Sequence, residues 1–393
     1  MRGGAVGVQA INWGLRLAPA RKAAFAALLA VDRGAWSAEA LAAKSMELDP
    51  RDAGLASDVV FGTLRRQGQL DALIDAYSSR PAAKMDAPIR IALRMALYQM
   101  RFLDRIPAHA AVNDAVELVR RAGKASGAAM VNAVLRRSLR EPVEIGEAAA
   151  TPGWLLERWR RQFGADAAAG IAHASLEAPT RYIRVPEGRV PPEGAVATEV
   201  AGCYELAAGE PGGYRFQDIG SQAIVPLLEI EAGQRFLDVC AAPGNKTAQA
   251  LERHPASAIA CELHHSRARG LRELGIPVVT LDATVALPFR AKFDRILVDA
   301  PCSGTGTLAR NPEIKWRLRA EDLADLPGRQ ARILRNALGA LAEGGRLVYS
   351  TCSLEREENE DVVAASGARV LRTVQRLPGR EAGDGFFAAL LAV

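Results

Sequence analysis

The sequence predicts an α/β fold with a parallel, doubly wound sheet over its C-terminal half, preceded by an all-helical domain. Two observations lead to this prediction. After Phe216, short β-rich runs alternate with helical ones, as in sheets whose strands are joined by crossover helices. Before Arg140, apolar residues recur at helical spacing, and few stretches alternate in the way that strands do. A smaller segment of mixed character lies between these two regions.

The helical pattern runs from about Arg21 to Arg140. In its clearest stretches, apolar residues recur every three or four positions and so share one face of a helix. These residues are Ile89, Leu93, Ala96 and Leu97 in one stretch, and Val112, Ala115, Val116 and Val119 in another. We therefore expect an all-helical domain over residues 21–143. Residues 1–20, rich in Gly and Ala with little charge, are expected to form a disordered leader.

The rest of the chain is predicted to hold two further parts. Residues 144–215 are expected to form a small α+β linker subdomain, with a helix near Trp154–Phe163 and a strand at Arg181–Val185 before a Pro- and Gly-rich stretch. Residues 216–393 are expected to form the α/β domain. Its predicted buried strands are Arg235–Val239, Ala258–Cys261, Val278–Leu281, Arg295–Val298 and Arg346–Tyr349, and its predicted helices are Lys246–Arg253, Ser266–Leu274 and Gln330–Leu341.

Composition narrows the class of protein. The chain has 393 residues, 49% of them hydrophobic and 24% charged, which is ordinary for a globular protein of two or three domains. It has no apolar run long enough to span a membrane, so we expect no membrane partner. Its five cysteines are scattered and form no Cys-x-x-Cys pair. We therefore expect reduced thiols, a cytoplasmic protein and no bound metal.

The charge is unevenly distributed. Residues 1–150 carry 21 Lys and Arg against 15 Asp and Glu, whereas residues 151–393 carry 29 against 30. A basic first third suits a polyanion as partner. Solvated basic helices explain the same charge equally well, so charge alone leaves the partner open.

Ligands of such sheets bind beyond the carboxyl ends of the strands. The first predicted strand runs into a tight turn of mostly small residues: Cys240, Ala241, Ala242, Pro243, Gly244, Asn245 and Lys246. This turn has neither glycine pattern that cradles phosphates, so it favours a cofactor with an adenosine and no phosphate. The next strands end in acids, of which Glu262 is placed for ribose hydroxyls and Asp282 for the adenine edge. Taken singly, each acid is as readily explained as a helix cap or a solvated carboxylate.

Two cysteines follow the last two predicted strands, and we expect them to lie close together. Cys302 comes after the strand that ends at Asp299, and Cys352 comes after the next strand. Carbon 5 of cytosine accepts a methyl group only after a thiolate adds to carbon 6. An acid such as Asp299 assists by hydrogen-bonding ring nitrogen 3, and a second polar group helps to release the product. Two cysteines and an acid match these demands, but the residues alone do not decide which cysteine attacks and leave a thiol–disulfide role open.

Residues 216–393 resemble the RsmB/NOP (Sun/Fmu) family of RNA 5-methylcytosine methyltransferases, which have a Rossmann-like class I methyltransferase domain. The resemblance is carried by Gln217-Asp218 with Ser221-Gln222, Asp238–Gly244, Asp299–Gly306, Pro312–Trp316, Tyr349–Leu354 with Glu357–Glu360, and Asp384–Phe387. It implies S-adenosyl-L-methionine as cofactor, bound by Cys240–Lys246, Glu262, Asp282 and Asp299. It also implies that Cys352 is the nucleophile and that Cys302 assists release of the adduct.

The helical domain resembles NusB, an RNA-binding antitermination factor, through Ala92–Gln99 and Ala111–Leu118. This fusion is similar to family members that methylate 16S ribosomal RNA, which implies an RNA partner. Nothing in the sequence demands a dimer, so we expect a monomer. Arg310, Lys315 and Trp316 are hypothesised to contact the RNA. Alternatives are another RNA such as tRNA, an RNA-binding adaptor with a degenerate catalytic domain, DNA as substrate, or a helical domain that serves only stability.

Two departures from the family pattern stand out. Asn245 replaces a usual glycine in the cofactor loop, and we expect the turn to survive because Asn tolerates positive φ. Pro186 follows Arg184-Val185 where the family has Asn, which puts one RNA or domain contact in doubt.

Overall fold

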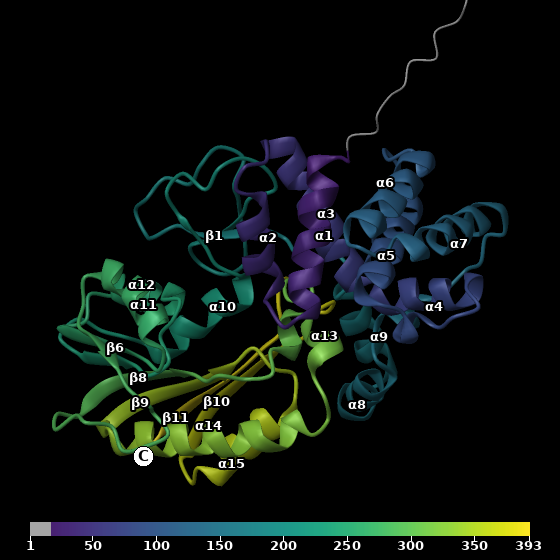
Figure 1. Ribbon diagram of the computed structural model, residues 1–393. Helices are drawn as coiled ribbons and strands as arrows, with labels where there is room; N and C mark the ends of the chain where they lie inside the picture. Colours follow the sequence, from purple (N-terminus) through teal and green to yellow (C-terminus); the bar gives the residue numbers. More distant parts are fainter. Residues whose placement is uncertain (1–16) are drawn as a thin grey trace, which may run out of the picture. The chain divides into compact units, whose positions relative to one another are not determined.

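The computed structural model describes residues 17–393, which divide into two compact units on either side of Gly146 and Glu147 (Figure 1). Residues 1–16, most of the leader expected to be disordered, lie outside the described residues. Pro19 and Ala20, which that expectation also included, already belong to the first helix.

The first unit is helical throughout its described residues, as predicted. Its α-helices are α1 (Pro19–Asp32), α2 (Ser37–Ser45), α3 (Pro50–Arg65), α4 (Gln67–Tyr77), α5 (Ala87–Phe102), α6 (Ala108–Arg121) and α7 (Ala128–Arg140). The apolar faces predicted for α5 and α6 turn inward, since Leu93, Val112 and Val119 are buried in one core with residues of α1 and α3. Arg21 of α1 crosses this core and donates to Asp114 of α6 at 2.6 Å, a buried ion pair that joins the first and sixth helices.

The second unit begins with the linker segment. Helices α8 (Gly153–Phe163) and α9 (Ala165–Ala174) precede a small antiparallel sheet in the order β2-β3-β1-β4, made of β1 (Tyr182–Arg184), β2 (Val196–Ala197), β3 (Cys203–Glu205) and β4 (Arg215–Phe216). Trp159 of α8 is fully buried and donates to the Glu355 carboxylate, and Arg158 pairs with the same carboxylate at 2.8 Å. The linker helices are thus built into the same compact unit as the larger sheet.

That larger sheet has seven strands in the order β10-β11-β9-β8-β5-β6-β7. The predicted strands are observed as β5 (Arg235–Asp238), β6 (Ser257–Glu262), β7 (Val278–Thr280), β8 (Phe293–Asp299) and β9 (Leu341–Thr351), all parallel to their neighbours among these five. Helices α10 (Ile219–Ile224), α11 (Asn245–Leu251), α12 (His265–Leu271), α13 (Ile314–Arg317), α14 (Asp322–Gly339) and α15 (Glu360–Ala365) accompany them.

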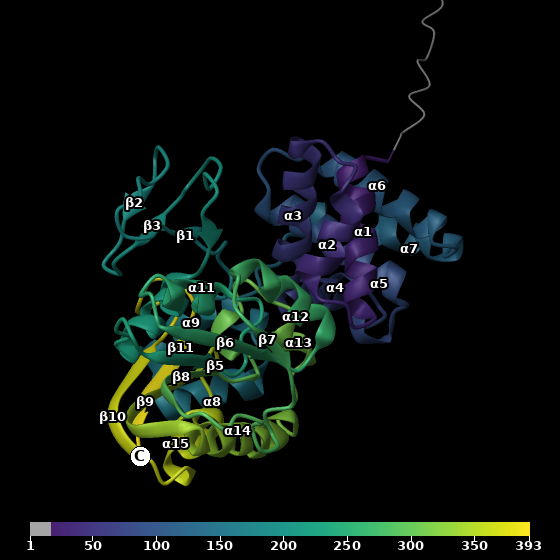
Figure 2. The ribbon, with the colours of Figure 1, turned by 90° about the vertical axis from the view of Figure 1, so that its left-hand side faces the viewer.

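Both faces of this sheet are covered, which explains why its central strands read as continuous apolar runs. Along β8, Ile296 and Val298 face a core that includes Ile333 of α14 and Val362 of α15, while Leu297 faces the opposite core. Residues from α10, α11 and the turn after α10 fill that second core. Figures 1 and 2 show α14 and α15 on one side of the sheet and α10 to α12 on the other.

The sheet contains two further strands that the sequence did not predict, and their antiparallel pairing makes the sheet mixed. β11 (Phe386–Ala392) runs antiparallel between β9 and β10 (Arg369–Arg376). Seven consecutive residues of β11 are buried, because the strand lies inside the sheet with a covered face on either side. Antiparallel neighbours need no crossover helix between them. The segment between β10 and β11 therefore lacks the strand–helix alternation on which the prediction depended.

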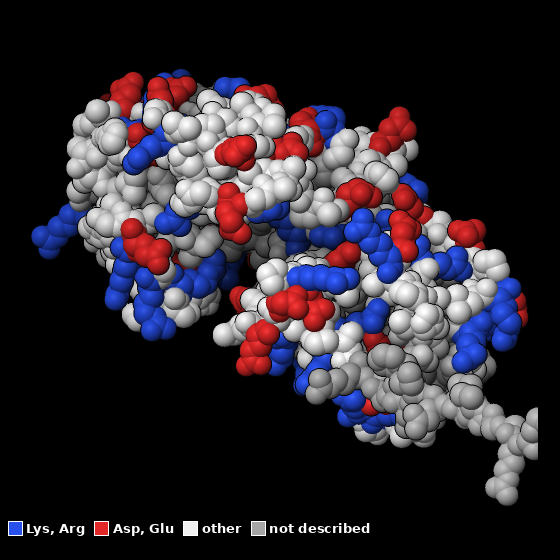
Figure 3. All heavy atoms as spheres, turned by 90° about the horizontal axis from the view of Figure 1, so that it is seen from above, with Lys and Arg blue, Asp and Glu red and all other residues white. Residues whose placement is uncertain are grey.

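The surface view shows blue and red side chains interspersed on the visible face (Figure 3). The excess of basic residues therefore does not form a single continuous field on that face. Among residues 17–393, no helix is long and apolar enough to cross a membrane.

Candidate active site

The carboxyl ends of the parallel strands open on a cavity of about 280 Å³. Its lining includes three acids and two cysteines that the sequence placed at strand ends: Glu262, Asp282, Asp299, Cys302 and Cys352. We call it the strand-end cavity. Parallel strands point their carboxyl ends to the same edge, which is why residues as far apart in the chain as Val239 and Cys352 meet here. In the described part of the chain, no cluster of three or more His, Cys, Asp or Glu has the arrangement of a metal site.

The two cysteines are close together, which confirms their predicted proximity. The Sγ atoms of Cys302 and Cys352 are 3.4 Å apart, within sulfur hydrogen-bonding distance. The hydrogen bond to Cys352 and burial raise the pKa of the Cys302 thiol well above its ordinary value. Both side chains remain partly exposed at the cavity. Cys302 is thus held as a neutral thiol against the sulfur of Cys352.

A partly buried ion pair lies beside the cysteines. Lys246, at the start of α11, places Nζ 2.8 Å from Oδ2 of Asp299, while Ser350 Oγ donates to the other carboxylate oxygen. Burial alone would lower the pKa of Lys246, but the Asp299 carboxylate outweighs it and raises that pKa. Nζ also lies 5.1 Å from the centre of the Phe386 ring. An ammonium, a carboxylate and an aromatic ring therefore meet next to the sulfur pair.

The cofactor loop turns sharply between β5 and α11. Gly244 has φ of 107°, and a Cβ on it would lie 2.9 Å from a methyl group of Leu271, so this position requires glycine. Asn245 is the first residue of α11, and its side-chain amide donates to the carbonyl of Phe216. The positive φ falls on Gly244 alone. We expected Asn245 to be tolerated because Asn can adopt a positive φ. This reason is wrong, since Asn245 does not adopt a positive φ.

The strand-end cavity suits an adenosyl cofactor without phosphates. Glu262 is buried with Oε1 accepting from the backbone of His264. The backbone N–H of Thr284 bonds Asp282 and lowers its pKa, which keeps this carboxylate ionised. Carboxylates accept hydrogen bonds from hydroxyl and amino groups and repel phosphates. Apolar side chains of Val239, Leu281 and Ile333 line the same cavity and suit the face of a purine ring.

Two of the three residues expected to contact RNA, Lys315 and Arg310, bind partners within their own unit. Lys315 is 1% exposed, and its Nζ donates to the carbonyl of Ala150 and to Ser175 Oγ in the linker segment. The expectation for Lys315 is wrong, because its charge points into the unit and not to the surface. Trp316 is half-buried, and its expected RNA contact stays a prediction.

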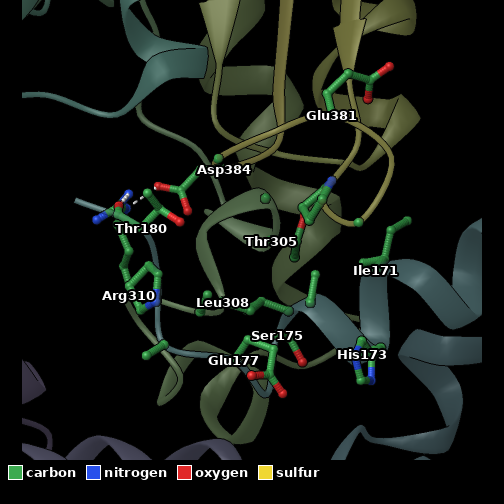
Figure 4. A pocket seen from close by; sticks show the side chains of 18 residues that line it. Ile171, His173, Ser175, Glu177, Thr180, Thr305, Leu308, Arg310, Glu381 and Asp384 are labelled. Atoms are coloured by element: carbon green, nitrogen blue, oxygen red, sulfur yellow. Dashed lines mark hydrogen bonds and ion pairs between the residues drawn. The ribbon is translucent and has the colours of Figure 1, made fainter. Parts of the chain in front are cut away.

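Arg310 is also held by partners within the unit, but 31% of its side chain is exposed, so its expected RNA contact stays a prediction. Its guanidinium pairs with Asp384 at 2.7 Å and with Asp218 at 2.8 Å, and both carboxylates are nearly buried. Figure 4 shows Arg310 and Asp384 joined across the wall of a second pocket that Thr180 and Thr305 also line. Burial and the Asp218 charge raise the pKa of Asp384 to about 7.

Phe386 is a site residue to which the sequence assigned no role. It lies in the stretch Asp384–Phe387, which supported only the family resemblance. Its position is set by β11, the strand that the sequence did not predict, because β11 pairs with β9 and brings Phe387 opposite Thr351. The available signal was an aromatic pair directly after Gly385, near the C-terminus, and no predicted strand was there to place it.

The sheet order, the covered faces and the strand-end cavity define a Rossmann-like methyltransferase domain joined to a helical domain. Residues 225–373 match the family described as 16S rRNA methyltransferase RsmB/F, and residues 18–140 match the NusB family. The ribosomal RNA small subunit methyltransferase B of Xanthomonas campestris is 34% identical over 94% of this chain and 96% of its own length. The Bacillus subtilis protein named probable ribosomal RNA small subunit methyltransferase B is 32% identical over 82% of this chain and 81% of its own length.

The chain belongs to this family of ribosomal RNA methyltransferases, and its cofactor is S-adenosylmethionine. Solved structures share the fold. The protein PH0851 superimposes with a TM-score of 0.81 at 21% identity, over 96% of this chain and 100% of its own. NSun6 from Pyrococcus horikoshii with SFG gives 0.54 at 20% identity, over 61% and 97%.

Proposed function

We propose that this protein transfers the methyl group of S-adenosylmethionine to carbon 5 of a cytosine in 16S ribosomal RNA, through a covalent bond between Cys352 and carbon 6. The observation that carries the proposal is the pair of sulfur atoms 3.4 Å apart, next to the Lys246–Asp299 ion pair. The names of the relatives support ribosomal RNA as substrate. The two intact cysteines count against an adaptor with a degenerate site.

Each residue of the site has a part in this reaction. The thiolate of Cys352 adds to carbon 6 while ring nitrogen 3 takes up a proton from solvent. The Asp299 carboxylate accepts a hydrogen bond from the resulting N–H, which stabilises the protonated ring of the adduct. Lys246 holds Asp299 in place and lies near enough to Cys352 to stabilise a thiolate. Bound S-adenosylmethionine supplies an electrophilic methyl group to carbon 5.

Release requires two bonds to break. Water takes the proton from carbon 5, the electron pair of that C–H bond forms the double bond between carbons 5 and 6, and the Cys352 sulfur departs from carbon 6 as a thiolate. Nitrogen 3 then returns its proton to solvent. Cys302 is proposed to assist this step, since its neutral thiol lies within hydrogen-bonding distance of that sulfur. We also propose that residues 21–143 bind the RNA, and that residues 144–215 link them to the catalytic residues 216–393. The target cytosine must be unpaired or flipped out to reach the cavity.

The test uses single cysteine variants with a 16S RNA transcript and labelled S-adenosylmethionine. Cys302→Ala should accumulate an RNA–protein adduct that survives denaturing electrophoresis, because release is blocked. Cys352→Ala should form no adduct and transfer no methyl group. Cys203→Ala, a buried cysteine of the small sheet, is the matched control and should behave as the unchanged protein. An adduct formed by Cys352→Ala would exchange the two roles, and an adduct in neither variant would reject the covalent route.

A further inference from the structure

A carboxylate below the cysteine pair joins the two loops that carry the cysteines. Glu358 is 0% exposed, and its side chain accepts three hydrogen bonds. The backbone N–H of Ser303 donates at 2.8 Å, Ser353 Oγ at 2.6 Å and the side-chain amide of Gln330 at 2.9 Å. A charge removed from water is very costly unless donors surround it, and three donors surround this one. The protein therefore maintains this buried carboxylate with a dedicated set of partners.

The donors come from the residues next to the two cysteines. Ser303 follows Cys302 in the chain, and Ser353 follows Cys352. The hydroxyl groups of these serines lie 3.0 Å apart, which adds a second link between the loops. Gln330 of α14 donates to the carbonyl of Pro301 as well as to Glu358. One carboxylate is thus bonded to the loop after β8, the loop after β9 and the helix that packs against both strands.

Glu358 itself is held in place by its neighbours. Tyr349 donates its hydroxyl hydrogen to the backbone carbonyl of Glu358 at 2.6 Å. The next residue, Asn359, accepts from Thr351 Oγ1 and donates to the carbonyl of Ser353, on either side of Cys352. A carboxylate with a fixed backbone and three partners has little freedom to move. It can therefore hold the two cysteine loops at a fixed distance from each other.

We propose that Glu358 is a positioning residue that sets the separation of Cys302 and Cys352 and directs the shared proton to Cys302. This inference rests on the proposed function of the two cysteines. Ser303 N–H connects the Glu358 charge to the loop of Cys302, where a negative charge opposes formation of a second thiolate. The ionisable groups that face Cys302 are Cys352, Glu358 and Tyr349, with Asp299 and Lys246 beside Cys352.

Glu358 thereby provides a physical basis for different roles of two chemically identical side chains. Its charge adds to burial and to the hydrogen bond that the Cys302 S–H makes to the Cys352 sulfur, and all three raise the pKa of Cys302. A neutral Cys302 keeps its S–H available for the Cys352 sulfur. Misplacement of reacting groups by about 1 Å costs on the order of 100-fold in rate, so loosening either loop should be visible in turnover.

The first variant is Glu358→Gln, which removes the charge and keeps the size of the side chain. Its matched control is Glu360→Gln, which makes the same change at an exposed position two residues away. Alkylation of Cys302 by iodoacetamide is followed by mass spectrometry over a range of pH in a Cys352→Ala background, where Cys302 is the only thiol of the pair. We expect the Cys302 profile of Glu358→Gln to move to lower pH, and that of Glu360→Gln to stay in place.

Turnover is measured separately with Cys352 intact. We expect Glu358→Gln to lower kcat about 100-fold while KM for S-adenosylmethionine changes little, because the cofactor carboxylates are untouched. The proposal would be overturned if folded Glu358→Gln left the alkylation profile of the Cys352→Ala background unshifted and, with Cys352 intact, kept the kcat of the unchanged protein.

A second variant keeps the proposal testable if Glu358→Gln does not fold. Ser353→Ala removes one tether but retains the Glu358 charge, so kcat should fall while the Cys302 profile stays unchanged. A normal kcat in folded Ser353→Ala would show that the tether does not position the loops. Alkylation needs neither RNA nor S-adenosylmethionine, so it reports on Glu358 even if no adduct with RNA ever forms. Failure of the proposed function and failure of this inference are therefore distinguishable.

Discussion

Two regions that adjoin in sequence use their polar residues in opposite ways. At the ends of β8 and β9, Asp299, Cys302 and Cys352 line the strand-end cavity. In the segment that follows the end of β8, residues 307–318, Arg310 and Lys315 are instead bound to partners of the same unit. The comparison teaches that a polar residue at the end of a parallel strand is a better indicator of a site than a cation in a loop. Topology determines where a strand end lies, whereas packing determines where a long side chain points.

The largest expected effect is a loss of turnover when the strand-end acid Asp299 is replaced. Asp299→Asn keeps the size of the side chain but loses the charge that would face the cytosine ring. We expect kcat to fall about 100- to 1,000-fold, as for loss of an acid–base group. The unfolding temperature should change by only about 2–4 °C. Methyl incorporation into RNA and calorimetry measure the two quantities.

The control for this variant lies on the same strand. Asp294→Asn removes a carboxylate at the opposite end of β8, where it pairs with Arg235. It should leave kcat unchanged. An equal loss of turnover in both variants would mean that the end of the strand is not what distinguishes Asp299.

The second prediction concerns the loop cation. Arg310→Met leaves the nearly buried carboxylates of Asp218 and Asp384 without their partner, which should lower the unfolding free energy by about 3 kcal/mol. Adding Asp384→Asn should recover part of that loss, because one unpaired charge is removed. Urea unfolding measures both. RNA affinity, measured well below the unfolding temperature, should not change.

Arg319→Met is the matched control for Arg310→Met, since Arg319 is exposed just beyond the same loop. It should leave stability nearly unchanged. Weaker RNA binding by Arg310→Met with normal stability would restore the RNA contact that the sequence suggested and remove the contrast between the two regions.

The smallest expected effect concerns Asp238, a strand-end acid that is buried and does not line the strand-end cavity. Burial raises the pKa of Asp238 at the end of β5 to about 7, although Thr247 donates to it. The folded protein therefore holds a proton that the unfolded chain loses near pH 4. Stability from this group is complete below about pH 4 and is lost as pH rises to about 7, by at most about 1.4 kcal/mol per pH unit.

Asp238→Asn cannot titrate, so its stability should fall less steeply than that of the unchanged protein between about pH 4 and 7. Urea unfolding at several pH values measures the slope. Asp166→Asn, at an exposed position in the same unit, should keep the original slope. An unchanged slope in Asp238→Asn would mean that Asp238 is ionised in the folded protein.

Much of the fold and the site was predictable because it depends on local pattern. The five parallel strands and the inner faces of α5 and α6 follow from apolar periodicity, which burial enforces. The proximity of Cys302 and Cys352 followed from the rule that parallel strands end at one edge. The hairpin of β10 and β11 was missed, and with it the placement of Phe386, because antiparallel neighbours need no helix between them.

The sequence by itself determined the class of fold, the family and the acids and cysteines that line the strand-end cavity. Only the tertiary structure decided that Lys246 serves Asp299, that Arg310 and Lys315 serve packing, and that Glu358 connects the two cysteine loops. The physical reason is range. Periodicity and strand ends depend on neighbours in the chain, whereas the partner of a buried charge is whichever donor or acceptor the folded chain brings within about 3 Å.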